Sequence, residues 1–329
     1  MSAPRITVIG SYATGLTLRV KRLPSRGETV LASGYRADYG GKGSNQAVGC
    51  ARLGAEIDFV ASIGTDDFAQ MALKLYREEG IDIRFLRQTR DLPTGVGFIL
   101  VDEQGHNCIA LDPGANESLS ASDIAASKAA VKGSTVLLTQ LEIPVEAAET
   151  ALALGRAEGA VTILNPAPVR PLPQSVLQSV DVLTPNQTEA NVLTGRNPDA
   201  AGDPEPIARD LIHAGVKQVV MTLGEKGALI VTASSAKHIP APAMPAVDTT
   251  GAGDAFNAGL ATALAFGENL ESAVQFAVVT GALAVTREGV IPSLPTRKDV
   301  IAFYRERNRT APSWLTPGKT SVKVEHLSS

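Results

Sequence analysis

The sequence has few of the residues that mark several classes of protein. Its 329 residues include two cysteines, four histidines and one tryptophan, and aromatic residues make up 4% of the chain. Cys50 and Cys108 are too few for a disulfide framework, and their apolar neighbours are typical of buried thiols. The histidines are scattered without the spacing of metal ligands, which argues against a structural zinc site.

An excess of basic residues and long apolar runs are also missing. The formal net charge is −4, so the chain lacks the positive field that nucleic-acid binding requires. No apolar run approaches the roughly 20 residues of a membrane span. The N-terminus enters a strand-like segment at residues 6–9 without the pattern of a signal peptide. We therefore expect a cytoplasmic protein that binds neither nucleic acid nor a membrane.

Strand-like and helical segments alternate along most of the chain, and 44% of its residues are hydrophobic. Buried strands are predicted at residues 6–9, 57–63, 136–141, 161–164, 181–183, 218–223 and 228–231. Helices are predicted at residues 67–79, 144–158, 187–194, 207–213, 253–266, 270–286 and 297–309. This alternation predicts an α/β fold with a doubly wound, mostly parallel sheet sandwiched between helices.

A second, smaller sheet is predicted from segments that lack helical periodicity. Residues 29–31, 35–39, 96–101 and 108–111 have the composition of short strands, and residues 102–105 predict a hairpin between the last two. We expect these segments, within about 12–40 and 94–112, to form a lid on a single domain of residues 1–310. The C-terminal tail, residues 311–329, is expected to be loose or to pack late.

The most informative stretch is residues 248–254, with the sequence DTTGAGD, which leads into the helix predicted at 253–266. Free amides and the dipole at a helix start favour an anion, and glycines let a phosphate approach the backbone. Asp254 stands in the first turn, where its carboxylate could take a proton from a hydroxyl that attacks phosphorus. Taken alone, a well-capped helix explains the same residues.

A second glycine cluster lies far upstream, at residues 40–48, and enters a helix that ends near Leu53. Lys42 and Asn45 offer donors to a hydroxylated or anionic ligand, although a solvated loop and helix cap explains them equally well. The chain has neither G-x-x-x-x-G-K-[ST] nor, after its first strand, G-x-G-x-x-G. A Walker-type NTPase and a dinucleotide-binding unit are therefore disfavoured.

The two glycine clusters together resemble the paired signatures of the ribokinase-like carbohydrate kinases, from about residue 6 to about residue 308. The resemblance implies that Asp254 is a general base and that the amides of Gly251, Ala252 and Gly253 form an anion hole. Glu142 ends a predicted strand, at the edge where open α/β sheets bind ligands. The substrate-binding residues implied by the resemblance are Gly41, Lys42, Asn45, Glu142 and Asp254.

Three further segments are similar to family positions that bind ATP and cations. Asn186 and Glu189 share a face at a helix start and could hold hydrated Mg²⁺, although a capping pair explains them as well. The turn after residue 222 lies on ATP in the family, and here the nucleotide-binding residues implied are Asn186, Thr222, Gly224 and Gly227. The resemblance also implies a monovalent cation, with ligands from Asp248, Thr250, Ser293 and the backbone of Ala284 and Gly289. In isolation, the C-cap of a hydrophobic helix explains the loop at residues 284–289 equally well.

This resemblance implies an ATP-dependent kinase that phosphorylates a terminal hydroxyl of a small sugar or polyol, with Mg²⁺ and K⁺. A nucleoside kinase of the same fold and a non-catalytic sugar- or nucleotide-binding relative are the alternatives, and the presence of Asp254 argues against the last. A small sheet leaves one face uncovered, so we expect a homodimer through the lid. The apolar surface would come from Val30, Leu31, Phe98 and Ile99.

The resemblance breaks at residues 10–15, with the sequence GSYATG. Ribokinases proper have Gly-Ser-x-Asn-x-Asp here, and the Asn and Asp hold the ribose hydroxyls. Ala13 replaces that Asn and Gly15 replaces that Asp. Because unpaired polar contacts are costly, we predict that ribose is a poor substrate. Tyr12, next to the gap, could supply a hydroxyl instead.

Overall fold

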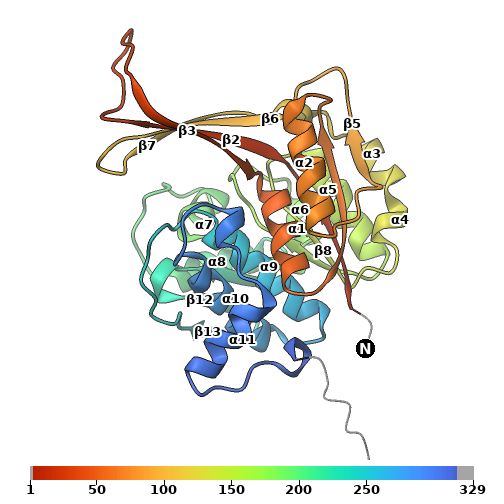
Figure 1. Cartoon of the computed structure of the whole chain (residues 1–329). Helices are drawn as coiled ribbons and strands as arrows, with labels where there is room; N and C mark the ends of the chain where they lie inside the picture. The colour runs from red at the N-terminus through yellow and green to blue at the C-terminus, as the bar shows by residue number, and fades with distance from the viewer. Residues whose placement is uncertain (1–2, 317–329) are drawn as a thin grey trace, which may run out of the picture.

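The computed structural model describes residues 3–316 of the chain, and a nine-stranded sheet forms its body (Figure 1). The strand order is β13-β12-β11-β10-β9-β8-β1-β4-β5. Neighbouring strands are parallel except where β12 pairs with β11 and β13. The strands are β1 (Arg5–Ile9), β4 (Glu56–Ile63), β5 (Leu86–Gln88), β8 (Val136–Thr139), β9 (Val161–Leu164), β10 (Val182–Leu183), β11 (Gln218–Thr222), β12 (Ala228–Thr232) and β13 (Ala236–Ile239).

Helices cover both faces of this sheet, and each face has its own hydrophobic cluster. One layer consists of α1 (Lys42–Arg52), α2 (Asp67–Glu78), α9 (Ala252–Ala265), α10 (Leu270–Ala284) and α11 (Arg297–Glu306). The other consists of α3 (Ala121–Ala126), α4 (Lys128–Val131), α5 (Val145–Ala157), α6 (Gln174–Gln178), α7 (Gln187–Leu193) and α8 (Pro204–His213). The predicted doubly wound, mostly parallel sheet is confirmed.

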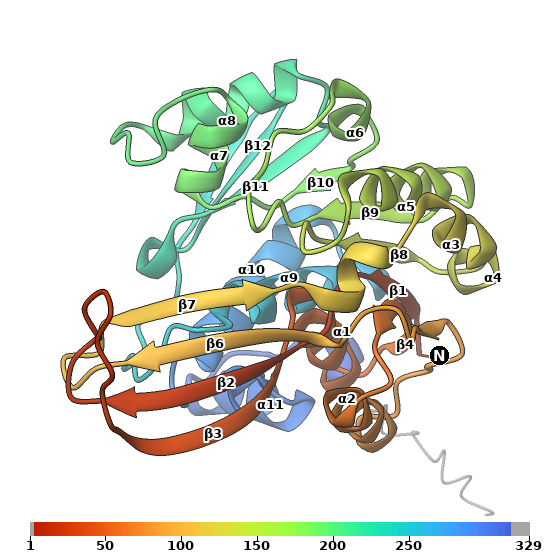
Figure 2. The same ribbon diagram turned by 90° about the horizontal axis from the view of Figure 1, so that it is seen from above.

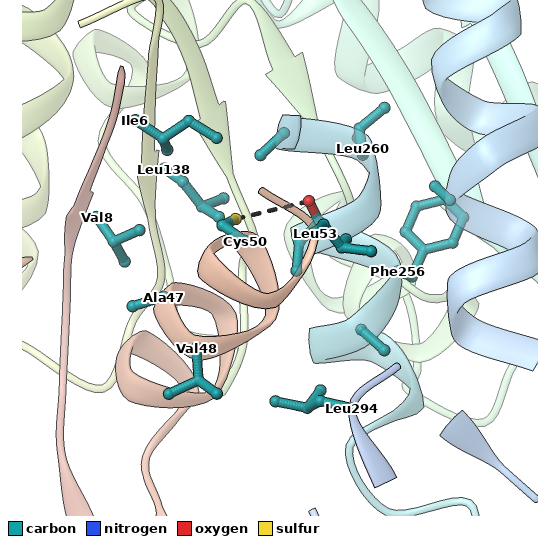
Figure 3. Close-up of a cluster of buried hydrophobic side chains, with 14 of the residues drawn as sticks. Ile6, Val8, Ala47, Val48, Cys50, Leu53, Leu138, Phe256, Leu260 and Leu294 are labelled. Carbon is teal, nitrogen blue, oxygen red and sulfur yellow. Dashed lines mark hydrogen bonds between the residues drawn. The ribbon is translucent and has the colours of Figure 1, made fainter. Parts of the chain in front are cut away.

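Helices α1 and α9 pack against each other over β1 and β8, as Figure 3 shows. A β-carbon added at Gly49 would stand 2.6 Å from the β-carbon of Ala258, so the two helices approach closely. Phe256 and Leu260 of α9 are buried in the same cluster, and burying a side chain of this kind contributes about 1.5–3 kcal/mol. This packing holds the N-termini of the two glycine-led helices next to each other.

A separate four-stranded sheet, which we call the lid, extends from the body (Figure 2). Its order is β3-β2-β6-β7, with β2 (Ala13–Val20), β3 (Ala32–Gly40), β6 (Gly95–Val101) and β7 (Asn107–Asp112). Strand β2 pairs antiparallel with β3 and parallel with β6, and β6 and β7 form the predicted hairpin. The small sheet expected from the sequence is confirmed, because β3, β6 and β7 contain the predicted segments 35–39, 96–101 and 108–111.

Two details of the lid were predicted wrongly. Residues 29–31 form no strand, and Leu31 is 91% exposed. The missed strand is β2, whose glycine and short side chains give it a weak local signal, but which is paired on both sides. Cys108 is exposed rather than buried, because it lies on β7, an edge strand of the lid in which every residue is exposed.

The chain packs against the body further than the predicted domain end at residue 310. The Trp314 ring stacks on Phe266 with ring centres 4.4 Å apart, and its indole N–H donates to Glu268 at 3.1 Å. Arg297 donates to the carbonyl of Leu315 at 2.7 Å. Of the tail expected at 311–329, the part at 317–329 lies outside the described residues. Across residues 3–316, no helix has the length and apolar character needed to cross a membrane.

Candidate active site

Asp254 lies in the first turn of α9, whose N-terminal cap is Gly251. Gly251 has a φ of 82°, in the left-handed region, and a β-carbon there would stand 2.7 Å from Val290 Cγ1. The sharp turn therefore requires glycine. Of the three amides expected to bind an anion, that of Ala252 donates to Thr249 O at 3.3 Å. The Asp254 side chain is buried, with the residue 7% exposed.

Two amide side chains of α1 hold the Asp254 carboxylate. Asn45 Nδ2 donates to Oδ2 at 2.8 Å, and Gln46 Nε2 donates to Oδ1 at 2.9 Å. Gln46 is itself held, because its Oε1 accepts Gln140 Nε2 at 2.6 Å and its Nε2 also reaches Asn165 Oδ1 at 3.1 Å. Each carboxylate oxygen thus has a fixed donor, and the two hydrogen bonds set the orientation of the carboxylate.

One polar atom beside this carboxylate has no partner in the described part of the chain. Asn45 is 5% exposed, and its Oδ1 accepts no hydrogen bond. A buried acceptor of this kind is costly unless a donor reaches it. A ligand hydroxyl is a donor of the right kind. Asn45 can therefore hold Asp254 through its Nδ2 and accept a hydrogen bond from a ligand at its Oδ1.

Glu142, which lies three residues after β8, accepts hydrogen bonds at the start of α1. Its Oε2 accepts Ser11 Oγ at 2.6 Å and the Lys42 amide at 2.8 Å. Gly41 caps α1 with a φ of 88°, and a β-carbon there would come within 2.7 Å of Tyr12 Cα. Glu142, Gly41 and Lys42 therefore come together as expected for one site, although one Glu142 oxygen is already used within the protein.

Two cavities meet at the start of α9. The smaller, of about 150 Å³, is lined by Lys42, Asn165, Ala167, Thr184, Asn186, Glu189, Thr222, Gly251, Gly253, Asp254 and Asn257. The larger, of about 850 Å³, is lined by Thr222, Gly224, Glu225, Lys226, Gly227, Ala241, Pro242, Ala243, Met244, Ala246, Thr249, Ala252, Gly253, Phe256, Val278, Gly281, Ala282 and Val285. Thr222 and Gly253 belong to both walls, so the two cavities adjoin.

Charge in the smaller cavity is mixed. Burial works to lower the pKa of the Lys42 ammonium. The negative charges of Asp254, Glu142 and Glu189 outweigh burial, so the pKa of Lys42 stands above its ordinary value and the ammonium stays charged. Burial raises the pKa of Glu189, although the Asn186 amide and the charge of Lys42 act in the opposite direction.

Asn186 and Glu189 form a capping box at the start of α7. Asn186 Oδ1 accepts the Glu189 amide at 2.8 Å, and Glu189 Oε2 accepts the Asn186 amide at 2.8 Å. The capping pair that the sequence left open is therefore present, and it leaves one Glu189 oxygen for another contact. Both residues also line the smaller cavity.

Among the residues expected to bind a monovalent cation, Asp248 contacts both Thr250 and Gly289, next to the start of α9. Asp248 Oδ1 accepts the Thr250 amide at 2.9 Å, and Oδ2 accepts the Gly289 amide at 3.0 Å. Partial burial would raise the pKa of Asp248, but these two amides outweigh it and hold the pKa below its ordinary value. Ala284 ends α10, and Ser293 Oγ donates to Val290 O at 2.8 Å.

Sequence reasoning missed several residues of this site. Gln46, Asn165, Thr184 and Asn257 were not singled out, although Asn165 directly follows β9 and could have been found at its carboxyl end. Asn257 accepts Thr184 Oγ1 at 2.6 Å and donates to Gly253 O at 2.8 Å, so it fixes the first turn of α9.

The alternative hydroxyl offered by Tyr12 is excluded. Tyr12 is fully buried, and its OH stands 3.1 Å from Thr14 Oγ1. Burial raises the pKa of Tyr12 to about 12. The side chain belongs to the core, where its ring meets Tyr76 edge to face.

Comparison with known proteins gives consistent matches over nearly the whole chain. Residues 3–297 match the model of the pfkB family of carbohydrate kinases. The chain is 36% identical over 300 residues to a ribokinase of Haemophilus influenzae, an alignment that covers 91% of this chain and 97% of that protein. It is 35% identical over 292 residues to a deoxyribokinase of Salmonella typhi, covering 88% and 95% of the two chains.

Solved structures agree with these matches. A ribokinase of Thermotoga maritima superposes with a TM-score of 0.84 at 37% identity, covering 91% of this chain and 99% of that one. A ribokinase of Arabidopsis thaliana, complexed with ribose and ATP, superposes with a TM-score of 0.85 at 31% identity, covering 92% and 98%. The resemblance drawn from the two glycine clusters is confirmed.

Proposed function

Because the chain belongs to the pfkB family of carbohydrate kinases, we propose that it transfers the γ-phosphoryl group of ATP to a terminal hydroxyl of a small, pentose-like sugar. One observation carries this proposal. Asp254 has both carboxylate oxygens held by amide donors, at a glycine-led helix start between two adjoining cavities. That is the placement a general base for phosphoryl transfer needs.

We place ATP in the larger cavity. Its wall combines the turn after β11, residues 241–244 and 246, and residues of α9 and α10, and its volume of about 850 Å³ is large enough for a nucleotide. The triphosphate would then run past Thr222 and Gly224 toward Gly253, which both cavities share. This direction brings the γ-phosphate to the helix start.

At the start of α9, each residue of the site has a separate role in the transfer. Asp254 accepts the proton of the attacking sugar hydroxyl. As the hydroxyl oxygen bonds to the γ-phosphorus, the bond between that phosphorus and the β-phosphate oxygen breaks and ADP leaves. The amides of Gly251 and Gly253 stabilise the charge on the transferring group, while the Ala252 amide is already partly engaged. Lys42 adds a fixed positive charge in the smaller cavity.

The residues present fit the cations that the family resemblance implies. Burial disfavours the charged form of Glu189, and a nearby Mg²⁺ would compensate that cost while it neutralises phosphate charge. Because Asn186 and Glu189 cap each other, we propose that they reach the ion through water. K⁺ prefers oxygen donors, and Asp248, Thr250, Ser293 and the carbonyls of Ala284 and Gly289 would supply them.

We further propose that two copies of the chain pair through the lid face that points away from the body. Leu16 and Leu18 lie in register with Phe98 and Tyr35 on this face. Phe98 is 52% exposed and Tyr35 is 66% exposed, so the face carries large apolar groups in solvent. Ile99, which was expected to contribute, lies on the opposite face of β6. The cytoplasmic location expected from the N-terminal sequence stays a prediction.

A substrate screen tests the proposed function. ADP formation would be measured with ATP and pentoses, hexoses, tetroses, polyols and nucleosides, and the product would be identified by mass spectrometry. We expect a pentose-like sugar to become monophosphorylated. Exclusive turnover of nucleosides would select a nucleoside kinase instead. Binding of ATP without phosphorylation of any compound would favour the non-catalytic alternative.

A further inference from the structure

Ala13 and Gly15 belong to a part of the lid face in which most residues are glycine or alanine. Gly40, Ala13 and Gly95 form one row across three strands, and Asp38, Gly15 and Gly97 form the next. Directly paired residues point to the same face of a sheet. Among these six residues, Asp38 alone carries a polar side chain on that face.

This face of the lid is turned toward the catalytic centre. Arg36 lies two residues before Asp38, so both side chains point to the same side. A β-carbon added at Gly289 would stand 3.9 Å from Arg36 Nη2, which places the guanidinium against the loop that contacts Asp248. Arg19, on the same face of β2, donates to Glu288 at 2.6 Å.

The Asp38 carboxylate is held at one oxygen and free at the other. Arg36 Nε donates to Asp38 Oδ2, and within residues 3–316 the second oxygen accepts no hydrogen bond. The Asp38 side chain is 32% exposed. Next to it, a β-carbon at Gly15 would meet only Ile99 Cδ1 at 3.6 Å and Asp38 O at 3.9 Å. The space beside Asp38 is thus open on the side of Gly15.

We propose that Asp38 determines sugar specificity by accepting hydrogen bonds from the substrate. Position 15 has no carboxylate, and its cross-strand partner Asp38 supplies one instead. In such a pair the β-carbons of the two positions lie roughly 5 Å apart. This inference rests on the proposed kinase function and deepens it. The carboxylate accepts hydrogen bonds from β3 instead of β2. It therefore binds sugar hydroxyls whose position or configuration differs from that of the ribose hydroxyls bound in a ribokinase.

The position of Asp38 along β3 indicates which end of the sugar it serves. Asp38 lies three residues before Gly41, or about 10 Å along the strand at roughly 3.3 Å per residue. Gly41 adjoins Lys42 and Asn45, and Asn45 contacts Asp254. Asp38 therefore binds hydroxyls remote from the one that is phosphorylated.

The competing explanation is a structural ion pair. Arg36 and Asp38 are partly exposed, and pairs of this kind contribute little to stability. A purely structural pair predicts that breaking it changes folding slightly and all substrates equally. The experiment must therefore measure discrimination between substrates and not activity alone.

The test compares Asp38→Asn with Glu103→Gln, which removes one negative charge from the exposed lid hairpin. Rates would be measured with saturating ATP and with D-ribose, D-arabinose, D-xylose, D-lyxose and 2-deoxy-D-ribose. A hydrogen bond to a charged group corresponds to a factor of about 10 to 100. We expect Asp38→Asn to lower kcat/KM for the preferred sugar by that factor, through its KM. The KM for ATP should not change, and Glu103→Gln should behave as wild type.

Deoxy analogues of the preferred sugar make the test specific. Wild type should reject the analogue that lacks the hydroxyl bound by Asp38 by about 10- to 100-fold, and Asp38→Asn should accept both compounds nearly equally. Equal losses for the sugar and every deoxy analogue would overturn the proposal and select the structural pair. Wild type that binds ATP but phosphorylates none of the sugars would contradict the kinase function and remove the role of Asp38 with it.

A second variant moves the carboxylate by one strand at constant net charge. Gly15→Asp combined with Asp38→Asn restores an acid at position 15, where the contacts of an added β-carbon are ordinary. We expect its ranking of the five sugars to shift toward D-ribose by at least about tenfold relative to the best wild-type sugar. A ranking identical to wild type would overturn the proposal.

Discussion

Gln46 offers a test of how Asp254 is oriented. Its side chain is fully buried and takes part in three hydrogen bonds, to Asp254 Oδ1, Asn165 Oδ1 and Gln140 Nε2. Methionine has a similar length and shape but cannot donate a hydrogen bond. Gln46→Met would therefore leave Asp254 with Asn45 as its one amide donor and free the carboxylate to turn.

The structure sets the magnitude of this effect. Loss of a hydrogen bond to a charged group costs about 1.5–3 kcal/mol, which is a factor of about 10 to 100 in rate if the oriented state is needed for turnover. The same substitution leaves Gln140 Nε2 and Asn165 Oδ1 without this partner. Because a buried unsatisfied group costs about 1–3 kcal/mol, we expect the free energy of unfolding to fall by about 2–4 kcal/mol.

The assay is kcat for ADP formation with the preferred sugar, at a temperature where urea titration shows both proteins fully folded. Gln70→Met is the matched control, because Gln70 is exposed on α2 and its side chain makes no hydrogen bond in the described structure. We expect the control to retain wild-type kcat and Gln46→Met to lose about 10- to 100-fold, with the KM for ATP little changed. A kcat within about threefold of wild type in Gln46→Met would refute the orienting role.

Three further outcomes are expected. Potassium should raise kcat relative to tetramethylammonium at matched ionic strength, and Asp248→Asn should remove the difference; equal rates of wild type in both salts would count against the cation site. Burial would raise the pKa of Asp299, but this carboxylate completes the capping box of α11 with Thr296 and pairs with Arg287, and these contacts bring its pKa to about 2. Asp299→Asn should therefore cost about 1–2 kcal/mol at pH 7 in denaturant titrations. Because the folded pKa is depressed, the difference from wild type should shrink as pH falls from about 4 toward 2, and a difference constant with pH would contradict this linkage. Phe98→Glu should turn a dimer into a monomer in sedimentation at micromolar concentration, and a wild-type monomer would exclude pairing through the lid.

The body of the fold could be predicted because its local signals agree with its tertiary arrangement. Buried parallel strands such as β4 and β8 consist mostly of apolar residues, and the helices between them have clear starts and stops. Strand β2 could not be predicted in this way. Its pairing partners β3 and β6 supply the hydrogen bonds that stabilise it, and the second of them follows about 80 residues later in the chain.

The residues of the candidate site also differ in whether local sequence identifies them. Asp254 and Lys42 follow glycines at helix starts, so local sequence is enough to single them out. Gln46 has no such signal, because its role depends on Gln140, which is 94 positions away, and on Asp254, 208 positions away. Residues that orient a catalytic group through long-range hydrogen bonds become visible only once the helices and strands are assembled.

The most direct measurement of the central claim is the turnover of Asp254→Asn. The substitution keeps the size of the side chain and removes the proton acceptor, so kcat should fall at least about 100-fold while the affinity for ATP changes little. Asp67→Asn is the matched control, because Asp67 also stands in the first turn of a helix but is exposed. It should retain wild-type kcat. Near-normal turnover by Asp254→Asn would contradict the assignment of Asp254 as the general base.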